Sequence, residues 1–185
     1  MKKEVKPIPF LYPIPIVLLG VKIEQRVNFT TIGDVAVMGL NPPLIVVSLH
    51  ENHFSTQWVR TIKQFSINLP VQEMLSRVDF CGMVSGKDED KSNIFQWNTT
   101  PLYPNVPLIE ESPANLICTV LQEVQVEKRC IFISNIVQTW LEEDLIDKSL
   151  NQWSPIAYGL DNRYYTIGEV IGTGYKEGQK WKLKA

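Results

Sequence analysis

The stretch at residues 44–70, LIVVSLHENHFSTQWVRTIKQFSINLP, places the strongest constraint on the fold. Its apolar runs at residues 44–49 and 65–69 predict two strands. A short helical pattern opens between them at Ser55 or Thr56, and we expect Ser55 to cap its first turn. A strand that turns directly into a helix presents unpaired backbone N–H groups and a partial positive charge. We therefore expect the ligand at this corner, where a phosphate would be suited.

These hydroxyls also have a purely structural explanation, because Ser and Thr often precede a helix only as caps. The loop at residues 85–92, SGKDEDKS, presents the same choice. Ser85, the Gly86 amide and Lys91 could reach an anion, but three consecutive acidic residues oppose one, and chemistry alone favours a solvated turn. The G-x-x-x-x-G-K-[ST] spacing is absent from the sequence, which argues against a nucleoside triphosphatase.

The remaining pattern predicts a mainly β chain with short helices. We expect further strands at residues 16–23, 26–32, 35–38, 115–126, 130–140 and 164–171. Apolar residues at helical spacing predict a helix from residue 71 to about 81, ended by Gly82. Residues 101–107 are expected to form an irregular connection. Short strands at this spacing, with one or two helices between them, indicate a small barrel.

Composition indicates an ordinary globular protein with one domain at residues 1–185. A net charge of -2 and 44% hydrophobic residues exclude a disordered chain and give no reason to expect nucleic acid as a partner. No signal peptide or apolar run long enough to cross a bilayer is evident, so no membrane partner is expected. Three cysteines without C-x-x-C spacing fit a reducing compartment, and we expect a cytoplasmic protein.

The chain shows no obvious acid–base apparatus for catalysis by side chains. Its two histidines, His50 and His53, match no zinc spacing, so no metal ligands are predicted. A Cys–His nucleophilic pair stays open, although cysteines in such patterns usually behave as small apolar residues. No catalytic residue is therefore predicted. The absence points to chemistry done by a cofactor, for which the protein supplies binding and electrostatics.

Several short motifs occur in a characteristic order. They are Tyr12-Pro13-x-Pro15, Asn28-Phe29-Thr30-Thr31-Ile32-Gly33, Asn52-His53-Phe54-Ser55-Thr56, Phe65-Ser66-Ile67-Asn68-Leu69-Pro70, Asp79-Phe80-Cys81-Gly82, Ser85-Gly86 and Asp90-Lys91-Ser92. Together they resemble the flavin reductase-like proteins with an FMN-binding split barrel, and most of all the flavoredoxin branch. The resemblance covers nearly the whole chain, although no single motif is specific.

The resemblance implies a six-stranded antiparallel split β-barrel that forms a homodimer, with one FMN per subunit near the dimer interface. It also implies three groups of FMN-binding residues. Asn28, Thr30, Thr31 and Ile32 would follow the edge of the isoalloxazine ring; His53, Ser55 and Thr56 would take the phosphate; and Ser85, Gly86 and Lys91 would close around it. On this implication the hydroxyls become ligands as well as caps.

The implied function is a flavin-dependent oxidoreductase. Electrons would pass from NADH or NADPH through the flavin to a second flavin, a metal chelate or a protein. The alternative is a flavoredoxin-type electron-transfer protein that holds FMN and has no nicotinamide site, and a third is a split barrel that has lost its flavin. Asp34 departs from the pattern of general flavin reductases, and a carboxylate near the ring would disfavour an anionic reduced flavin. The donor, the acceptor, the exchange of FMN and any redox role of Cys81 stay open.

Overall fold

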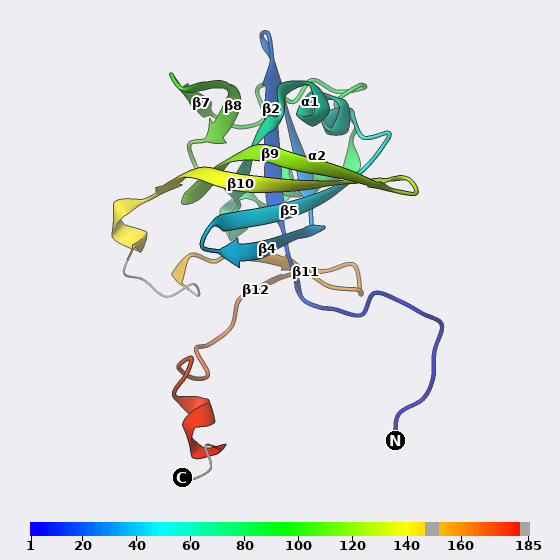
Figure 1. Cartoon of the computed structure of the whole chain (residues 1–185), viewed down its shortest axis with the longest axis vertical. Helices are drawn as coiled ribbons and strands as arrows, with labels where there is room; N and C mark the ends of the chain where they lie inside the picture. The colour runs from blue at the N-terminus through cyan, green and yellow to red at the C-terminus, as the bar shows by residue number, and fades with distance from the viewer. Residues whose placement is uncertain (147–151, 182–185) are drawn as a thin grey trace.

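A computed structural model describes residues 1–146 and 152–181 of the chain. Its main sheet has seven antiparallel strands in the order β3-β2-β6-β9-β10-β5-β4 (Figure 1). The strands are β2 (Val17–Ile23), β3 (Arg26–Ile32), β4 (Val35–Leu40), β5 (Pro43–His50), β6 (Gln64–Leu69), β9 (Ala114–Val126) and β10 (Arg129–Leu141). This confirms the predicted mainly β split-barrel class, with one strand more in the main sheet than the six expected.

Two smaller sheets complete the β structure. One joins β1 (Ile14–Pro15), β11 (Ile156–Tyr158) and β12 (Tyr164–Thr166), and the other joins β7 (Trp97–Thr100) and β8 (Tyr103–Ile109). The prediction of an irregular connection at residues 101–107 was wrong. Because β8 pairs only with β7 in its sheet, its free edge tolerates prolines that cannot donate a hydrogen bond. The strand expected at residues 164–171 ends at Thr166.

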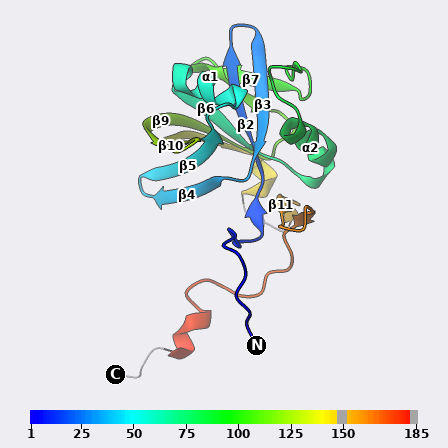
Figure 2. The same cartoon turned by 90° about the vertical axis from the view of Figure 1, so that its right-hand side faces the viewer.

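The helices in the described part of the chain are short, and two of them, α1 and α2, flank the strand β3. They are α1 (Phe54–Ile62), η1 (Gln72–Met74), α2 (Leu75–Met83), η2 (Glu143–Leu145) and η4 (Glu177–Trp181). The helix predicted to start at residue 71 begins with the 3-10 turn η1, and it continues through Gly82 instead of ending there. Figure 2 shows β3 between α1 and α2. Both helices contact this strand, which therefore carries the cavity described below.

The strand β2 is buried on both of its faces. Leu19 and Val21 belong to a core cluster with strands β5, β6, β9 and β10, whereas Leu18 packs on the opposite face with Val78 of α2. Successive side chains of a strand point to opposite faces. This two-sided burial explains the continuous apolar run at residues 16–19, and it fixes the neighbouring strand β3 within the core.

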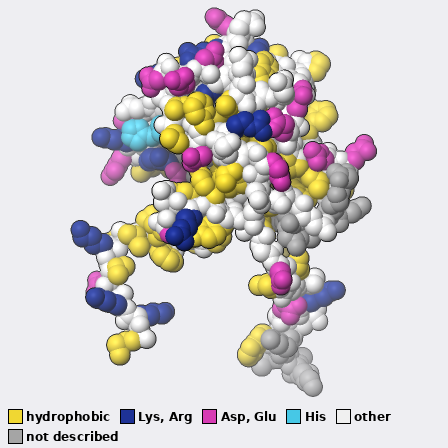
Figure 3. All heavy atoms as spheres, turned by 180° about the vertical axis from the view of Figure 1, so that it is seen from behind, with side chains coloured by type: hydrophobic (Ala, Val, Ile, Leu, Met, Phe, Trp, Pro, Cys, Tyr) yellow, Lys and Arg dark blue, Asp and Glu magenta, His cyan; other side chains and the backbone are white. Residues whose placement is uncertain are grey.

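The N-terminal arm and the C-terminal segment up to residue 181 project from the same side of the barrel (Figure 2). The view from behind shows them as two separate extensions (Figure 3). The N-terminal arm, residues 1–13, exposes Phe10 and Leu11, with 74% and 82% of their surfaces accessible. None of the described helices has the length and apolar character needed to cross a membrane.

Candidate functional site

A polar cavity of about 300 Å³ opens where β3 meets the start of α1 and the end of α2. We call it the polar cavity. It is lined by Asn28, Thr30, Thr31, Asn52, His53, Phe54, Ser55, Gly82, Met83, Val84, Ser85 and Gly86. Most of the predicted FMN-binding residues are therefore brought together from three distant parts of the sequence.

The first turn of α1 reaches this cavity without a side-chain cap. His53 occupies the N-cap position with extended backbone, φ -65° and ψ 137°, and no capping bond forms with any residue that the structure describes. The prediction that Ser55 caps the helix was wrong, because the His53 carbonyl already accepts a hydrogen bond of 3.0 Å from the Thr56 N–H, which places the N-cap two residues earlier. The uncapped turn leaves backbone donors and the positive end of the helix dipole available to an anion.

The Ser55 hydroxyl instead faces strand β3. Its Oγ accepts a hydrogen bond of 2.7 Å from Asn28 Nδ2, and both residues are buried. Asn28 Oδ1 has no hydrogen-bond partner within the described part of the chain. A buried polar atom without a partner is costly, so it points to a group that this cavity is built to receive.

The backbone of Gly86 lies directly against Asn28. A methyl group at Gly86 would fall 2.2 Å from Asn28 Oδ1 and 2.5 Å from Phe54 Cδ1. Only a residue without a side chain allows the loop to approach β3 and α1 so closely. Ser85 and Gly86 thus form one wall of the cavity, while the neighbouring acidic residues 88–90 lie outside it.

The rest of this loop is attached to β3. Ser92 Oγ accepts from the Val27 N–H at 3.0 Å and donates to the Val27 carbonyl at 3.2 Å. Lys91 Nζ donates to the carbonyls of Phe29, at 3.2 Å, and Cys81, at 2.9 Å. Lys91 is only 1% exposed, and burial lowers the pKa of its ammonium. The structure therefore gives Lys91 the role of fastening the loop from behind the cavity wall.

Two more predicted residues lie outside the cavity lining. Thr56 is fully buried, and its hydroxyl donates to the His50 carbonyl at 2.8 Å. Ile32 packs its side chain into the barrel core. Thr30 and Thr31 do line the cavity, and Thr31 Oγ1 donates to the Val78 carbonyl at 2.5 Å, which joins β3 to α2.

The surroundings of His53 in the polar cavity disfavour its protonation. Burial lowers the pKa of His53, and repulsion from His50, Arg129 and Lys91 lowers it further, whereas Asp34 raises it. Figure 3 shows histidine on the surface with Lys or Arg and Asp or Glu side chains nearby. His53 is therefore neutral near pH 7, and a bound anion would favour its protonated form.

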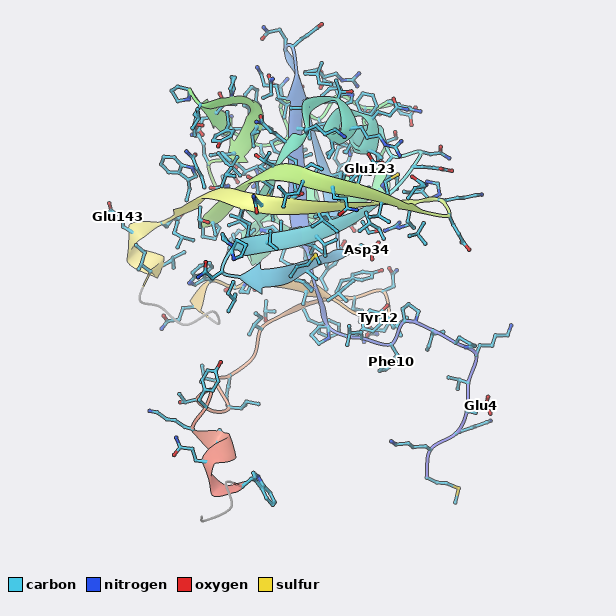
Figure 4. The ribbon with its side chains drawn as sticks, in the orientation of Figure 1. Glu4, Phe10, Tyr12, Asp34, Glu123 and Glu143 are labelled. Atoms are coloured by element: carbon cyan, nitrogen blue, oxygen red, sulfur yellow. The ribbon has the colours of Figure 1, made fainter. Side chains whose placement is uncertain are left out.

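An apolar groove of about 570 Å³ lies beyond the other end of β3. We call it the apolar groove. The N-terminal arm and strands β4, β5 and β10 line it through Pro9, Leu11, Tyr12, Pro13, Ile14, Pro15, Gly33, Asp34, Val35, Ala36, Val46, Ser48, Arg129 and Ile131. Figure 4 labels Tyr12 on the arm beneath the sheet edge that carries Asp34.

The groove carries one ion pair. The Arg129 guanidinium binds the Asp34 carboxylate and also donates to Ser48 Oγ at 3.0 Å and to the Ser48 carbonyl at 2.8 Å. The sequence analysis expects the Asp34 carboxylate near the ring, and the structure shows that this carboxylate is paired with Arg129. The pairing reduces the negative charge that Asp34 would present there.

The cysteines are buried, and within the described residues all three are free thiols. Burial raises the pKa of Cys81 to about 11, so little thiolate forms at neutral pH. Among the described residues, no group of three His, Cys, Asp or Glu side chains is placed to hold a metal ion.

Sequence reasoning missed several residues of the cavity. Asn52, Phe54, Gly82, Met83 and Val84 line it but were not predicted as ligands. Arg26 was missed as well: its guanidinium donates to the Gly86 carbonyl and lies 5.0 Å from the centre of the Phe54 ring. Asn52, Phe54 and Gly82 adjoin predicted residues within the quoted motifs, a signal that could have identified them. Nothing local marks Arg26.

Comparisons with known proteins identify solved structures that share this fold. A flavoredoxin from Methanosarcina acetivorans superposes with a TM-score of 0.90 at 27% identity, covering 97% of this chain and 100% of that one. The flavoredoxin of Desulfovibrio vulgaris (Miyazaki F) gives a TM-score of 0.87 at 22% identity, over 97% of this chain and 100% of that one. An FMN-binding protein from Thermus thermophilus gives 0.82 at 23% identity, over 94% of this chain and 98% of that one.

A sequence relative and a family model extend these matches. An uncharacterized protein of Archaeoglobus fulgidus is 27% identical over 139 residues, 74% of this chain and 78% of that protein. The model of the flavin reductase like domain matches residues 10–168, which include the whole lining of the polar cavity and all of the apolar groove except Pro9. The chain therefore belongs to the flavin reductase-like family.

Proposed function

We propose that the protein binds FMN and acts as a flavin-dependent oxidoreductase. The observation that carries the proposal is the polar cavity, in which the uncapped start of α1 and the unpartnered Asn28 Oδ1 face the Gly86 wall. The backbone N–H groups at the start of α1 are donors that fit a phosphate monoester, and FMN carries one, whereas Asn28 Oδ1 is an acceptor that would take a hydrogen bond from a donor group of the ligand. When bound, the flavin would take electrons from NADH or NADPH and pass them to a flavin, a metal chelate or a protein acceptor.

The residues of the chain would contact the flavin at two places, the polar cavity and the apolar groove. Ser55, the α1 backbone and Ser85 would hold the phosphate, while Thr30 and Thr31 would lie along the path from the polar cavity toward Gly33. From Asn28 to Gly33 the strand advances about 16 Å, so the two places can belong to one elongated ligand. The apolar groove would exclude water from the ring, and the Arg129–Asp34 pair would set the local charge.

A second candidate is an electron-transfer protein that holds FMN but has no nicotinamide site. The likeness to two flavoredoxins at TM-scores of 0.90 and 0.87 favours this candidate. A flavin reductase designated PheA2 is less similar, with a TM-score of 0.68 at 17% identity. Both candidates use the same FMN site, and they differ only in the electron donor.

We further propose that two copies of the chain form a homodimer through β4. This strand is an edge of the main sheet, and it exposes Val37, Met38 and Leu40, with 65%, 53% and 88% of their surfaces accessible. An apolar edge strand is suited to pairing with a second chain. Sedimentation of the wild type and of Val37→Lys tests this proposal, because the variant is expected to sediment as a monomer.

An absorbance experiment tests the function. Purified protein is mixed with FMN, passed through a desalting column and titrated anaerobically with NADH and then NADPH. Retained flavin bands that bleach with either nicotinamide support the oxidoreductase. Bands that persist until dithionite is added support the electron-transfer protein. A protein that retains no FMN contradicts the proposal.

A further inference from the structure

Arg26 stands outside the polar cavity but contacts two of its walls. It is the first residue of β3, and its guanidinium donates to the Gly86 carbonyl while lying over the Phe54 ring. Gly86 belongs to the loop wall, and Phe54 is the first residue of α1. One side chain thus bridges the loop, the helix and the strand.

The geometry shows what this bridge supports. The Gly86 backbone is wedged between Asn28 and Phe54 so tightly that it leaves no room for a Cβ atom. Ser92 and Lys91 fasten the far end of the loop to Val27 and Phe29. At the near end, the side chain that attaches the loop to β3 is Arg26.

The Arg26 charge acts only at a distance on the Asp90 carboxyl of the same loop, whose pKa is lowered first by hydrogen bonds from Ser92 and further by Arg26. Arg26 forms no ion pair with a carboxylate among the described residues, in contrast to Arg60, Arg77 and Arg129. A planar guanidinium can donate to a carbonyl and stack on an aromatic ring at once, a combination that a lysine ammonium does not reproduce.

We propose that Arg26 is a positioning residue that latches the Ser85–Gly86 wall against α1 and thereby sets the affinity of the polar cavity for a phosphate group. This inference rests on the proposed function of that cavity. Arg26 acts through Gly86 and Phe54, so its loss is expected to loosen the wall even when no ligand is present.

The first part of the test needs no ligand. Amide hydrogen exchange is compared in the wild type, Arg26→Met and Arg26→Lys, with Arg77→Met as the matched control. Arg77 also lies over a phenylalanine ring, Phe95 at 4.8 Å, and pairs with Glu111 away from the cavity lining. Arg26→Met is expected to speed exchange at the Asp88 and Glu89 amides, which both bond the Ser85 carbonyl, at least tenfold. Unchanged exchange would overturn the latch.

The second part measures binding of FMN and riboflavin by flavin fluorescence. Arg26→Met is expected to weaken FMN at least tenfold and riboflavin less than twofold, while Arg77→Met changes neither. Arg26→Lys keeps the charge and is expected to regain only part of the FMN affinity. Full recovery with loop amides that still exchange fast would show a pure charge effect and overturn the latch.

The two proposals fail in different ways. If the wild type binds no FMN, the proposed function fails, and with it the phosphate role of Arg26. If the wild type binds FMN and Arg26→Met binds it equally well, the proposed function stands and the inference about Arg26 is overturned.

Discussion

The polar cavity and the apolar groove are built by different means. The polar cavity is held by hydrogen bonds between distant segments, such as Asn28 to Ser55 and Lys91 to Phe29. The groove is formed by the N-terminal arm over the sheet, with the Arg129–Asp34 ion pair and Ser48 as its polar features among the lining residues. Directional donors in fixed positions recognise charge, whereas apolar contact is roughly proportional to area. The first region should therefore distinguish FMN from riboflavin, and the second should affect both equally.

Among these variants, Gly86→Ala is expected to cause the largest loss of FMN affinity. Its new methyl group would meet Asn28 Oδ1 at 2.2 Å, which forces the cavity wall outward. Overpacking that costs about 3 kcal/mol of binding free energy corresponds to an FMN affinity lowered on the order of 100-fold. Gly82→Ala lines the same cavity but meets its nearest atom at 3.5 Å, so it serves as the matched control. Calorimetric titration measures the affinities, and equal values for the two variants would contradict the tight fit.

Ser55→Ala sharpens the comparison at the phosphate end. Loss of a hydrogen bond to a charged group, about 1.5 kcal/mol, is expected to weaken FMN roughly tenfold and leave riboflavin unchanged. Thr56→Ala is the neighbouring control, because the Thr56 hydroxyl bonds the His50 carbonyl within the fold. It should lower the free energy of unfolding by about 1 kcal/mol without changing FMN affinity. If Ser55→Ala weakens the binding of FMN and of riboflavin equally, the phosphate does not bind at Ser55.

Leu11→Ser tests the groove. Leu11 lines it and is 82% exposed, so the change should leave the fold intact. The lost apolar contact contributes about 0.7 kcal/mol of binding free energy. Its removal is expected to weaken the binding of FMN and of riboflavin by the same factor, roughly threefold. Leu121→Ser, an exposed leucine on β9, controls for a general surface effect. An effect on FMN alone would show that the two regions do not divide the ligand as proposed.

His53 provides the smallest effect, a dependence of stability on pH. Its pKa is lowered in the folded protein from 6.5, mainly by burial, so the unfolded chain binds more protons between the two pKa values. The free energy of unfolding should therefore fall as the pH drops through 6.5. Urea unfolding at pH 5.5 and 7.5 measures this, and His53→Gln is expected to flatten the dependence. If His53→Gln leaves the pH dependence of the free energy of unfolding unchanged, that dependence arises from other titrating groups.

Much of the fold followed from local patterns. The strand at residues 26–32 coincides with β3, and the strand–helix–strand unit at residues 44–70 appears as β5, α1 and β6. Such elements carry their periodicity in the sequence itself. The strand β8 did not, because its prolines are tolerated only by a free sheet edge that the tertiary structure supplies.

The candidate site was likewise predicted only in part from the sequence. Ser55, Ser85 and Gly86 were predicted from the resemblance, and the structure brings them to one cavity. Lys91 was expected at the ligand, but its ammonium donates to two carbonyls in the interior. A sequence shows that a cation is present but not which acceptors the fold places near it. Arg26 was missed for the same reason, since its partners Gly86 and Phe54 are distant in sequence.

The buried Lys91 has a consequence for ligand exchange. Because it ties the loop to α2 and β3 from inside, the loop is not free to swing open as a lid. The N-terminal arm is different: the backbone bonds of residues 8–11 join the arm only to itself within the described chain. We therefore expect the residence time of a bound flavin to be governed by the arm. Whether FMN stays through many turnovers or leaves after each one then becomes a question about the N-terminal arm, residues 1–13, ahead of the barrel.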